Sequence, residues 1–289
     1  MAIVLMAVSI ISFGQIAVKS TILYGTITQN DLMQAPFNKW FDSIYNAYQP
    51  DTKITAAIKK TNTKDISMDI FLGTWCGDSK REVPRFMKLL HDASFATSQV
   101  KLIGLGGSDS LYKQGPKQEE AGKGIFRVPV FIVYKNGVEV GRINEFPVTS
   151  LEKDLQTILT GGDYSPNYKS FSLLSEWLND GTLLNKNSNI RGMSMQLKSL
   201  VNNERELNSL GYLLLQQGKK EEAFKVFQLN AQLYPESANV LSSLGEGYYK
   251  IGDNKTAVQF LERALEINKD PLLVKEILQI LYEVKGLKG

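Results

Sequence analysis

The sequence predicts two structural classes in one chain: an α/β sandwich built on a mixed sheet, and after it an all-α domain of repeated helices. Three observations carry this prediction. Up to about residue 160, short apolar runs typical of strands alternate with stretches of helical periodicity. An Asn-Gly pair between two β-rich runs indicates a hairpin. From Leu207 onward, similar residues recur at intervals of 34.

The elements of the first half follow in order from the apolar pattern. Buried strands are expected at 66–73 (ISMDIFLG) and 100–106 (VKLIGLG), with a helix over 78–95 between them. Residues 128–143 contain the two runs of the hairpin, on either side of Asn136-Gly137. A last helix is expected over 149–159, opened by Thr149 or Ser150 and stopped by Gly161-Gly162.

This order of elements fixes the expected sheet. A strand-helix-strand unit implies parallel pairing, whereas the terminal hairpin is antiparallel. The first domain, over 15–162, is therefore expected to be a mixed sheet with helices on both faces.

The second half contains a repeat. Leu207, Leu210-Gly211, Gly218 and Ala223 recur 34 residues later as Leu241, Leu244-Gly245, Gly252 and Ala257. This period, with small residues in both helices, resembles the tetratricopeptide repeat. The repeat domain is expected over 205–289, ending in a capping helix over 272–286. Because two repeats rarely bury a continuous core alone, residues 163–204 are expected to form helices that pack against the first copy.

The N-terminus suggests export. Residues 1–14 (MAIVLMAVSIISFG) are mostly apolar and uncharged, too short to span a bilayer, and end in small residues before Gln15. This is the pattern of a signal peptide, although no Lys or Arg precedes it and the true start could lie upstream. The protein is then expected in the periplasm or outside the cell. A buried N-terminal element and a retained anchor are the alternatives.

Composition excludes some functions. The net charge of +3 over 289 residues gives no case for nucleic acid, which calls for a clustered basic face. One His and one Cys cannot assemble a zinc or haem site, so we expect neither metal nor cofactor. His91 is too far along its helix to pair with the cysteine. The long connection over 107–124 is expected near the cysteine, as a surface insertion or a lid.

Cys76, within GTWCGDS, is the only cysteine and is the candidate nucleophile. It follows a predicted buried strand and opens the next helix. A helix N-terminus presents free N–H groups and partial positive charge, which stabilise a thiolate. The amides of Gly77 and Asp78 would serve this role. The Asp78 carboxylate would destabilise the Cys76 thiolate, unless Lys80 or Arg81 offsets its negative charge.

The strand, the TWCGDS motif and the downstream RVPVFIVYKNG together resemble the thioredoxin-like family over about residues 55–160. The resemblance implies that Val128-Pro129 is a cis bond beside Cys76 and that Pro129 shapes a substrate groove. It also implies that Trp75 shields the thiol.

Two departures from the family limit the transfer of activity. Ser79 stands where the family has its second, resolving cysteine, so a dithiol cycle is unavailable. The family's buried acid is replaced by Ile70, with Asp69 expected on the opposite face of the strand.

Three hypotheses remain open. Cys76 is a working monothiol that exchanges disulfides with a protein or peptide partner and is resolved by an outside thiol such as glutathione. Alternatively, the domain has no redox activity and serves with the repeats as a protein-binding adaptor. Lastly, Cys76 is a small buried structural residue. Whether the protein is an enzyme depends on which of these three hypotheses is correct.

Overall fold

The computed structural model describes residues 22–108 and 111–286. The predicted signal segment over 1–14 lies outside these residues. Within the part of the chain that is described, no helix is both long and apolar enough to cross a membrane.

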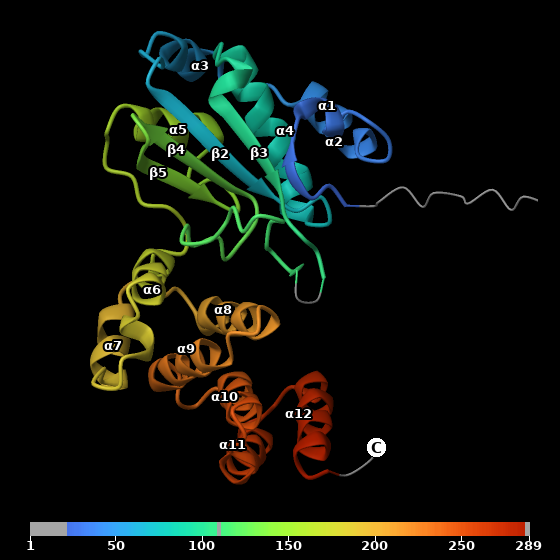
Figure 1. The fold of residues 1–289 in the computed structure, drawn as a ribbon, viewed down its shortest axis with the longest axis vertical. Helices are drawn as coiled ribbons and strands as arrows, with labels where there is room; N and C mark the ends of the chain where they lie inside the picture. The colour runs from blue at the N-terminus through green and yellow to red at the C-terminus, as the bar shows by residue number, and fades with distance from the viewer. Residues whose placement is uncertain (1–21, 109–110, 287–289) are drawn as a thin grey trace, which may run out of the picture.

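The chain has a sheet-containing half followed by a stack of helices (Figure 1). The elements of the first half are β1 (Gly25–Ile27), α1 (Gln29–Leu32), α2 (Asn38–Ala47), α3 (Thr52–Lys59), β2 (Ile66–Leu72), α4 (Gly77–Asp92), the short 3-10 helix η1 (Thr97–Gln99), β3 (Val100–Gly104), β4 (Val130–Lys135), β5 (Val138–Asn144) and α5 (Leu151–Leu159).

The five strands form one sheet in the order β1-β3-β2-β4-β5. β2 and β3 run parallel, and the other three pairs are antiparallel. The predicted mixed sheet is thus confirmed. The hairpin between β4 and β5 turns at Asn136 and Gly137, both with positive φ (51° and 78°), as a two-residue type I′ turn requires.

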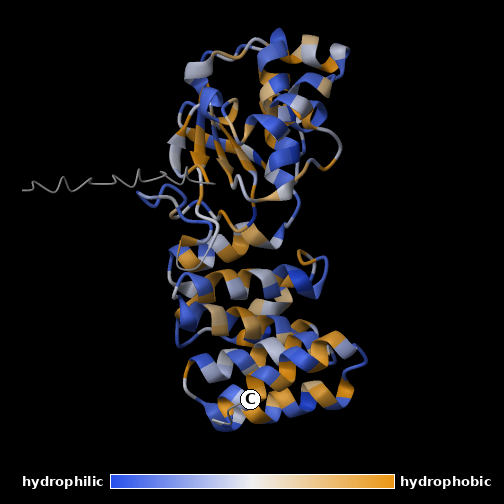
Figure 2. Ribbon diagram, turned by 90° about the vertical axis from the view of Figure 1, so that its right-hand side faces the viewer, coloured by the Kyte–Doolittle hydropathy of each residue, from blue (hydrophilic) through white to orange (hydrophobic). Residues whose placement is uncertain are grey.

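The prediction of helices on both faces of the sheet was wrong. The buried apolar side chains of α1 to α5 all join the core on one face, with Met68 and Ile70 of β2. The opposite face, with Phe71 and Ile132, is covered by the loop residues Ile125 and Val128. Helices α1 to α5 lie on the same side of the sheet, which Figures 1 and 2 show from two directions. The long connection after β3 covers the other face as irregular chain, because its polar, glycine-rich sequence has no apolar helical period.

The structure also contains elements that the sequence pattern did not reveal. β1 and α1 to α3 occupy the segment before β2. Strand β1 has only three residues, and α1 has four, so neither gives a readable period. Helix α2 is longer, and Phe41 is its fully buried anchor against the core shared with α4.

The second half consists of helices and a short 3-10 turn: α6 (Ser170–Asn179), η3 (Thr182–Leu184), α7 (Ile190–Leu197), α8 (Glu204–Gln216), α9 (Lys220–Leu233), α10 (Ala238–Lys250), α11 (Asn254–Ile267) and α12 (Pro271–Val284). One core joins α6 and α7 to α8 and α9. A second core joins α10, α11 and α12.

The 34-residue period reappears in the helices. Helices α8 and α10 begin 34 residues apart, as do α9 and α11. Two glycines explain how each pair packs. A Cβ on Gly211 would lie 2.3 Å from the Phe227 ring, and one on Gly245 would lie 2.8 Å from Leu261. The absence of a side chain is therefore what lets the paired helices approach closely.

We predict that Gly211→Ala destabilises the protein. The added methyl group would overlap the Phe227 ring, so α8 and α9 must move apart. Such overpacking lowers the free energy of unfolding by about 1–3 kcal/mol. Urea denaturation of the full chain measures the change. Gly192→Ala, on the exposed side of α7 where the nearest atom would be 3.9 Å away, is the matched control and is expected to be neutral or stabilising. Equal stability of the two variants would contradict the packing role of Gly211.

Candidate functional site

Cys76 lies at the carboxyl end of β2 and is the N-cap residue of α4. Its own N–H donates to the Gly73 carbonyl at 2.9 Å, and its carbonyl accepts from the Lys80 N–H at 3.0 Å. The side chain is partly exposed and forms no disulfide. The chain therefore presents this sulfur at a helix N-terminus, where the amides of Gly77 and Asp78 have no intrahelical acceptor.

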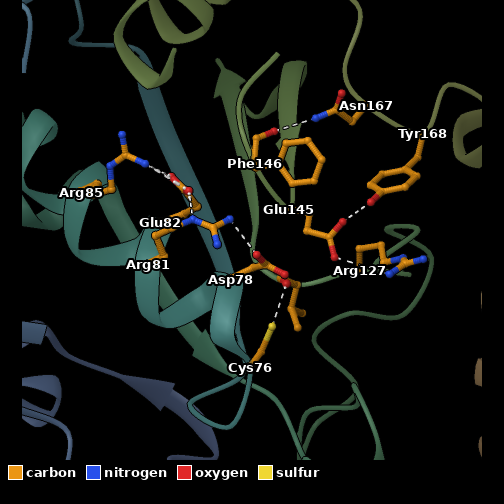
Figure 3. Close-up of polar contacts among 11 residues, drawn as sticks. Cys76, Asp78, Arg81, Glu82, Arg85, Arg127, Glu145, Phe146, Asn167 and Tyr168 are labelled. Carbon is orange, nitrogen blue, oxygen red and sulfur yellow. Dashed lines mark hydrogen bonds and ion pairs between the residues drawn. The ribbon is translucent and has the colours of Figure 1, made fainter. Parts of the chain in front are cut away.

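The Cys76 sulfur meets a segment that is 52 residues away in the sequence. Its Sγ lies 3.3 Å from the carbonyl oxygen of Val128 and donates to it (Figure 3). The Val128–Pro129 peptide bond is cis. The structure thus brings together Cys76 and Val128-Pro129, as the sequence analysis expected. The Val128 side chain is buried, so it presents its backbone to the site.

Trp75 lies between two glycines. Its indole N–H donates to the Leu105 carbonyl at 3.1 Å, and its ring is 5.1 Å from that of Tyr112. A Cβ on Gly73 or Gly107 would come within 2.6 Å of the indole. These glycines let the ring lie flat against the backbone, where it packs with Cys76 over the loop-covered face of the sheet.

Ser79, three residues after Cys76, does not reach the surface. Its side chain is fully buried, and its hydroxyl accepts a hydrogen bond of 3.1 Å from the Gly73 N–H. Ser79 is therefore shielded from any partner in this structure. Its hydroxyl instead ties the first turn of α4 to the end of β2, which fixes the turn that carries Trp75 and Cys76.

Charged groups line the approach to Cys76. The Asp78 carboxylate accepts from Arg81 at 2.7 Å, so its charge is paired. Arg81 also contacts Glu82, which is buried and bonded to Arg85 at 3.1 Å. Figure 3 shows this row on one side and Glu145 with its partners on the other.

Asp69 lies on the opposite face of β2 from Ile70, as expected. It pairs with Lys123 at 2.6 Å, and Tyr134 donates to it at 3.4 Å. Ile70 is fully buried on the helix side. The Ile70 position of β2 therefore carries no acid, and Asp69 instead binds the long connection to the sheet through Lys123.

A second group of residues was not singled out as part of the site by the sequence analysis. Arg127 lies 3.5 Å from the Glu145 carboxylate, and Tyr168 donates to the same carboxylate. Burial raises the pKa of Tyr168, and the neighbouring Glu145 adds to this effect. Because Arg127 is next to Val128 in the sequence, its place beside the site could have been predicted. Glu145 and Tyr168 lie outside any motif and become visible only in the structure.

Lys113 is a buried cation close to this group. Its ammonium donates to the Phe126 carbonyl at 2.8 Å. Burial, followed by the nearby Arg127 charge, lowers its pKa to about 8, although Glu145 and Cys76 act in the opposite direction.

The helical half contacts the site through Arg127. Its guanidinium donates to the Ser209 hydroxyl of α8 at 2.9 Å. Next to it, Phe126 packs edge-on against Phe171 of α6, with ring centroids 5.2 Å apart. The residues directly before the cis bond therefore touch both Cys76 and the helices.

Among the residues that the structure describes, no cluster of His, Cys, Asp and Glu has the arrangement to hold a metal ion. His91 is largely exposed and contacts Asp92 at 3.0 Å, far along α4 from its first residue.

Comparison with known proteins identifies the repeat. Residues 240–275 match the tetratricopeptide repeat family. The match covers α10, α11 and the start of α12. A search of curated proteins finds no match to the chain. Tetratricopeptide repeats present surfaces to protein partners, so the helical half indicates protein–protein interaction.

We predict that Ser79→Ala lowers the free energy of unfolding by about 1–3 kcal/mol, because it leaves the Gly73 N–H buried without an acceptor. Urea denaturation measures the loss. Ser172→Ala, at an exposed position of α6, is the control and is expected to be close to neutral. If both variants unfold at the same urea concentration, Ser79 does not hold the turn.

We further predict a pH dependence caused by Lys113. Its pKa is about 8 in the folded chain against an ordinary 10.5, so between these values the unfolded chain holds a proton that the folded chain has released. Stability therefore rises with pH, by about 2 kcal/mol from pH 7.5 to 9.5. Lys113→Met removes this rise. Parallel stability–pH curves for the wild type and Lys113→Met would contradict the assignment.

Proposed function

We propose that this protein is an exported thioredoxin-like protein that exchanges disulfides with a protein partner through the single thiol of Cys76. The observation that carries the proposal is the position of Cys76. A partly exposed sulfur opens α4 and lies 3.3 Å from the carbonyl that precedes the cis Val128–Pro129 bond. The apolar pattern over 1–14 supports a location in the periplasm or outside the cell.

Three further features support the thioredoxin-like assignment of the first half. β2, α4 and β3 form a strand-helix-strand unit with parallel strands. β4 and β5 form the antiparallel hairpin after Pro129. The proline bond is cis and lies beside the cysteine, as the family resemblance implies.

The proposed reaction has two exchange steps. The Cys76 thiolate attacks one sulfur of a disulfide RS–SR′, forming Cys76–S–SR and releasing R′S⁻. A second thiolate, from glutathione or from the partner itself, then attacks the RS sulfur. This step releases the Cys76 thiolate and leaves a new disulfide on R. No net oxidant or reductant is consumed, and the outside thiol takes the place of the missing second cysteine.

The first turn of α4 would stabilise the sulfur during exchange. The free amides of Gly77 and Asp78 face a charge that develops on Cys76. Arg81 pairs with the Asp78 carboxylate and so reduces its repulsion. Pro129 and Trp75 would form the walls that receive the segment of the partner, and the helical half would bind the rest of that partner.

Trapping a mixed disulfide tests this function. The reduced full chain is incubated with the symmetric disulfide of a short cysteine-containing peptide, and the intact mass is measured. One peptide is expected per wild-type chain and none on Cys76→Ser. Adding glutathione is expected to release the peptide. Ser172→Ala serves as a matched control with Cys76 intact. A wild-type chain that acquires peptide only after unfolding would contradict the proposal.

Ser79→Cys supplies the second thiol and gives a separate prediction. N-cap and N3 residues lie on one side of the first helical turn, where their Cα atoms fall within the roughly 4.4–6.8 Å that a disulfide spans. We expect Cys76 and the new cysteine to form an internal disulfide on mild oxidation, with the loss of two hydrogen atoms by mass. Persistence of two free thiols after oxidation would show that the first turn does not bring these positions together.

A second candidate function is a non-enzymatic adaptor that binds proteins through both halves. The structural use of Ser79 favours it, because a buried hydroxyl that holds the backbone has no role in exchange. The two functions differ in what Cys76→Ser does to partner capture. Capture is lost if the thiol forms the link, and it is retained if the surfaces alone bind.

A further inference from the structure

Helix α12 is the last helix that the structure describes, and one of its faces is uncovered there. Its buried residues Ile277, Leu281 and Val284 pack in the core shared with α10 and α11. Beside this core, Val274, Leu278 and Tyr282 form an apolar row at four-residue spacing along a shallow surface groove, and Leu278 also contacts the core. Leu272, two residues before Val274, is 78% exposed and Tyr282 is 46% exposed. An outer face of a repeat solenoid that meets only water normally carries polar side chains.

The uncovered face corresponds to the place where the two preceding repeats receive their second helix. Gly211 of α8 and Gly245 of α10 accept Phe227 and Leu261 at distances too short for any side chain. The residue 34 positions after Gly245 is Gln279. A glutamine there prevents the close approach that α9 and α11 make. A further helix of the same repeat therefore does not fit this face as it fits the other two.

The charges on this face are arranged symmetrically. Lys275 and Glu283 line the same groove as Gln279, four residues to either side of it. Within the described part of the chain neither makes an ion pair, whereas Lys285 beyond them is paired with Glu262 at 2.9 Å. The row Lys275-Gln279-Glu283 is thus positive toward the N-terminus, negative toward the C-terminus and neutral at its centre.

We propose that this face binds a second copy of the same chain, with the two α12 helices antiparallel about a two-fold axis. That arrangement places Leu278 against Leu278 of the second copy and Val274 against its Tyr282. It also places Lys275 beside Glu283 of the second copy, twice by symmetry, with the two Gln279 side chains between the ion pairs. A parallel arrangement would instead set like charges side by side.

The expected dimer is weak. Helix α12 has 14 residues and is about 21 Å long, so a single helix pair buries less than the roughly 1,600 Å² of a standard stable interface. We expect association in the micromolar range. Because the ion pairs lie at the rim, added salt should weaken the dimer.

Charge reversal distinguishes a second copy from any other occupant. Sedimentation of the full chain over the micromolar range is expected to show a monomer–dimer equilibrium. Lys275→Glu and Glu283→Lys each place like charges together twice, and each is expected to weaken the dimer roughly 5- to 10-fold. The double variant restores opposite charges and is expected to recover wild-type affinity. Lys220→Glu, at an exposed position of α9, is the matched control and should change nothing.

Leu278→Glu is expected to remove the dimer, and its thermal unfolding shows whether α12 remains folded. The exposed charge variants test the proposal even if that variant unfolds. A chain that is monomeric at every concentration overturns the proposal and leaves the face to a different protein. A dimer that ignores both single reversals, or one that the double variant fails to restore, also overturns it.

Discussion

The four-residue segment 126–129 is the constraint on which the arrangement of this protein depends. Its Val128 carbonyl accepts from Cys76, and its cis proline leads directly into β4. On the other side, Phe126 packs against α6 and Arg127 donates to α8. A single short stretch of backbone therefore sets the surroundings of the thiol and joins the sheet to the helices. A partner bound on the helices would act within a few side chains of Cys76.

The segment is itself held by groups from other parts of the chain. Lys113 bonds to the Phe126 carbonyl from within the long connection, and Lys123 fastens that connection to Asp69. Ser79 fixes the opposite wall by holding the end of β2 against the first turn of α4. The candidate site is thus a contact between two restrained backbone segments, with the Cys76 thiol between them.

The sequence predicts those parts of the fold that depend on local pattern. The apolar spacing predicts the strand-helix-strand unit, and the recurrence at 34 residues predicts the repeat. The Asn136-Gly137 pair predicts the hairpin. The short elements before β2 carry too few residues for a period. Helices were expected on both faces of the sheet because such units usually have them. The connection after β3 lacks the apolar spacing of a helix, so irregular chain covers the second face of the sheet instead.

Less of the site was predictable. The meeting of Cys76 with Val128-Pro129 was expected from the family resemblance. The burial of Ser79 was not, because a serine in the first turn of a helix can point either way until the packing is known. Likewise, the low pKa of Lys113 arises from tertiary burial, which a loop sequence does not disclose.

The central claim is that the fold makes Cys76 reactive rather than hiding it. The most direct measurement is the rate of exchange of Cys76 with a small aromatic disulfide at neutral pH, for the folded chain and for the same chain unfolded in urea. The account predicts that the folded chain reacts faster, because only folding brings the helix N-terminus to the sulfur. A folded chain that reacts more slowly than the unfolded one would contradict it and leave a protein that binds its partners without exchange.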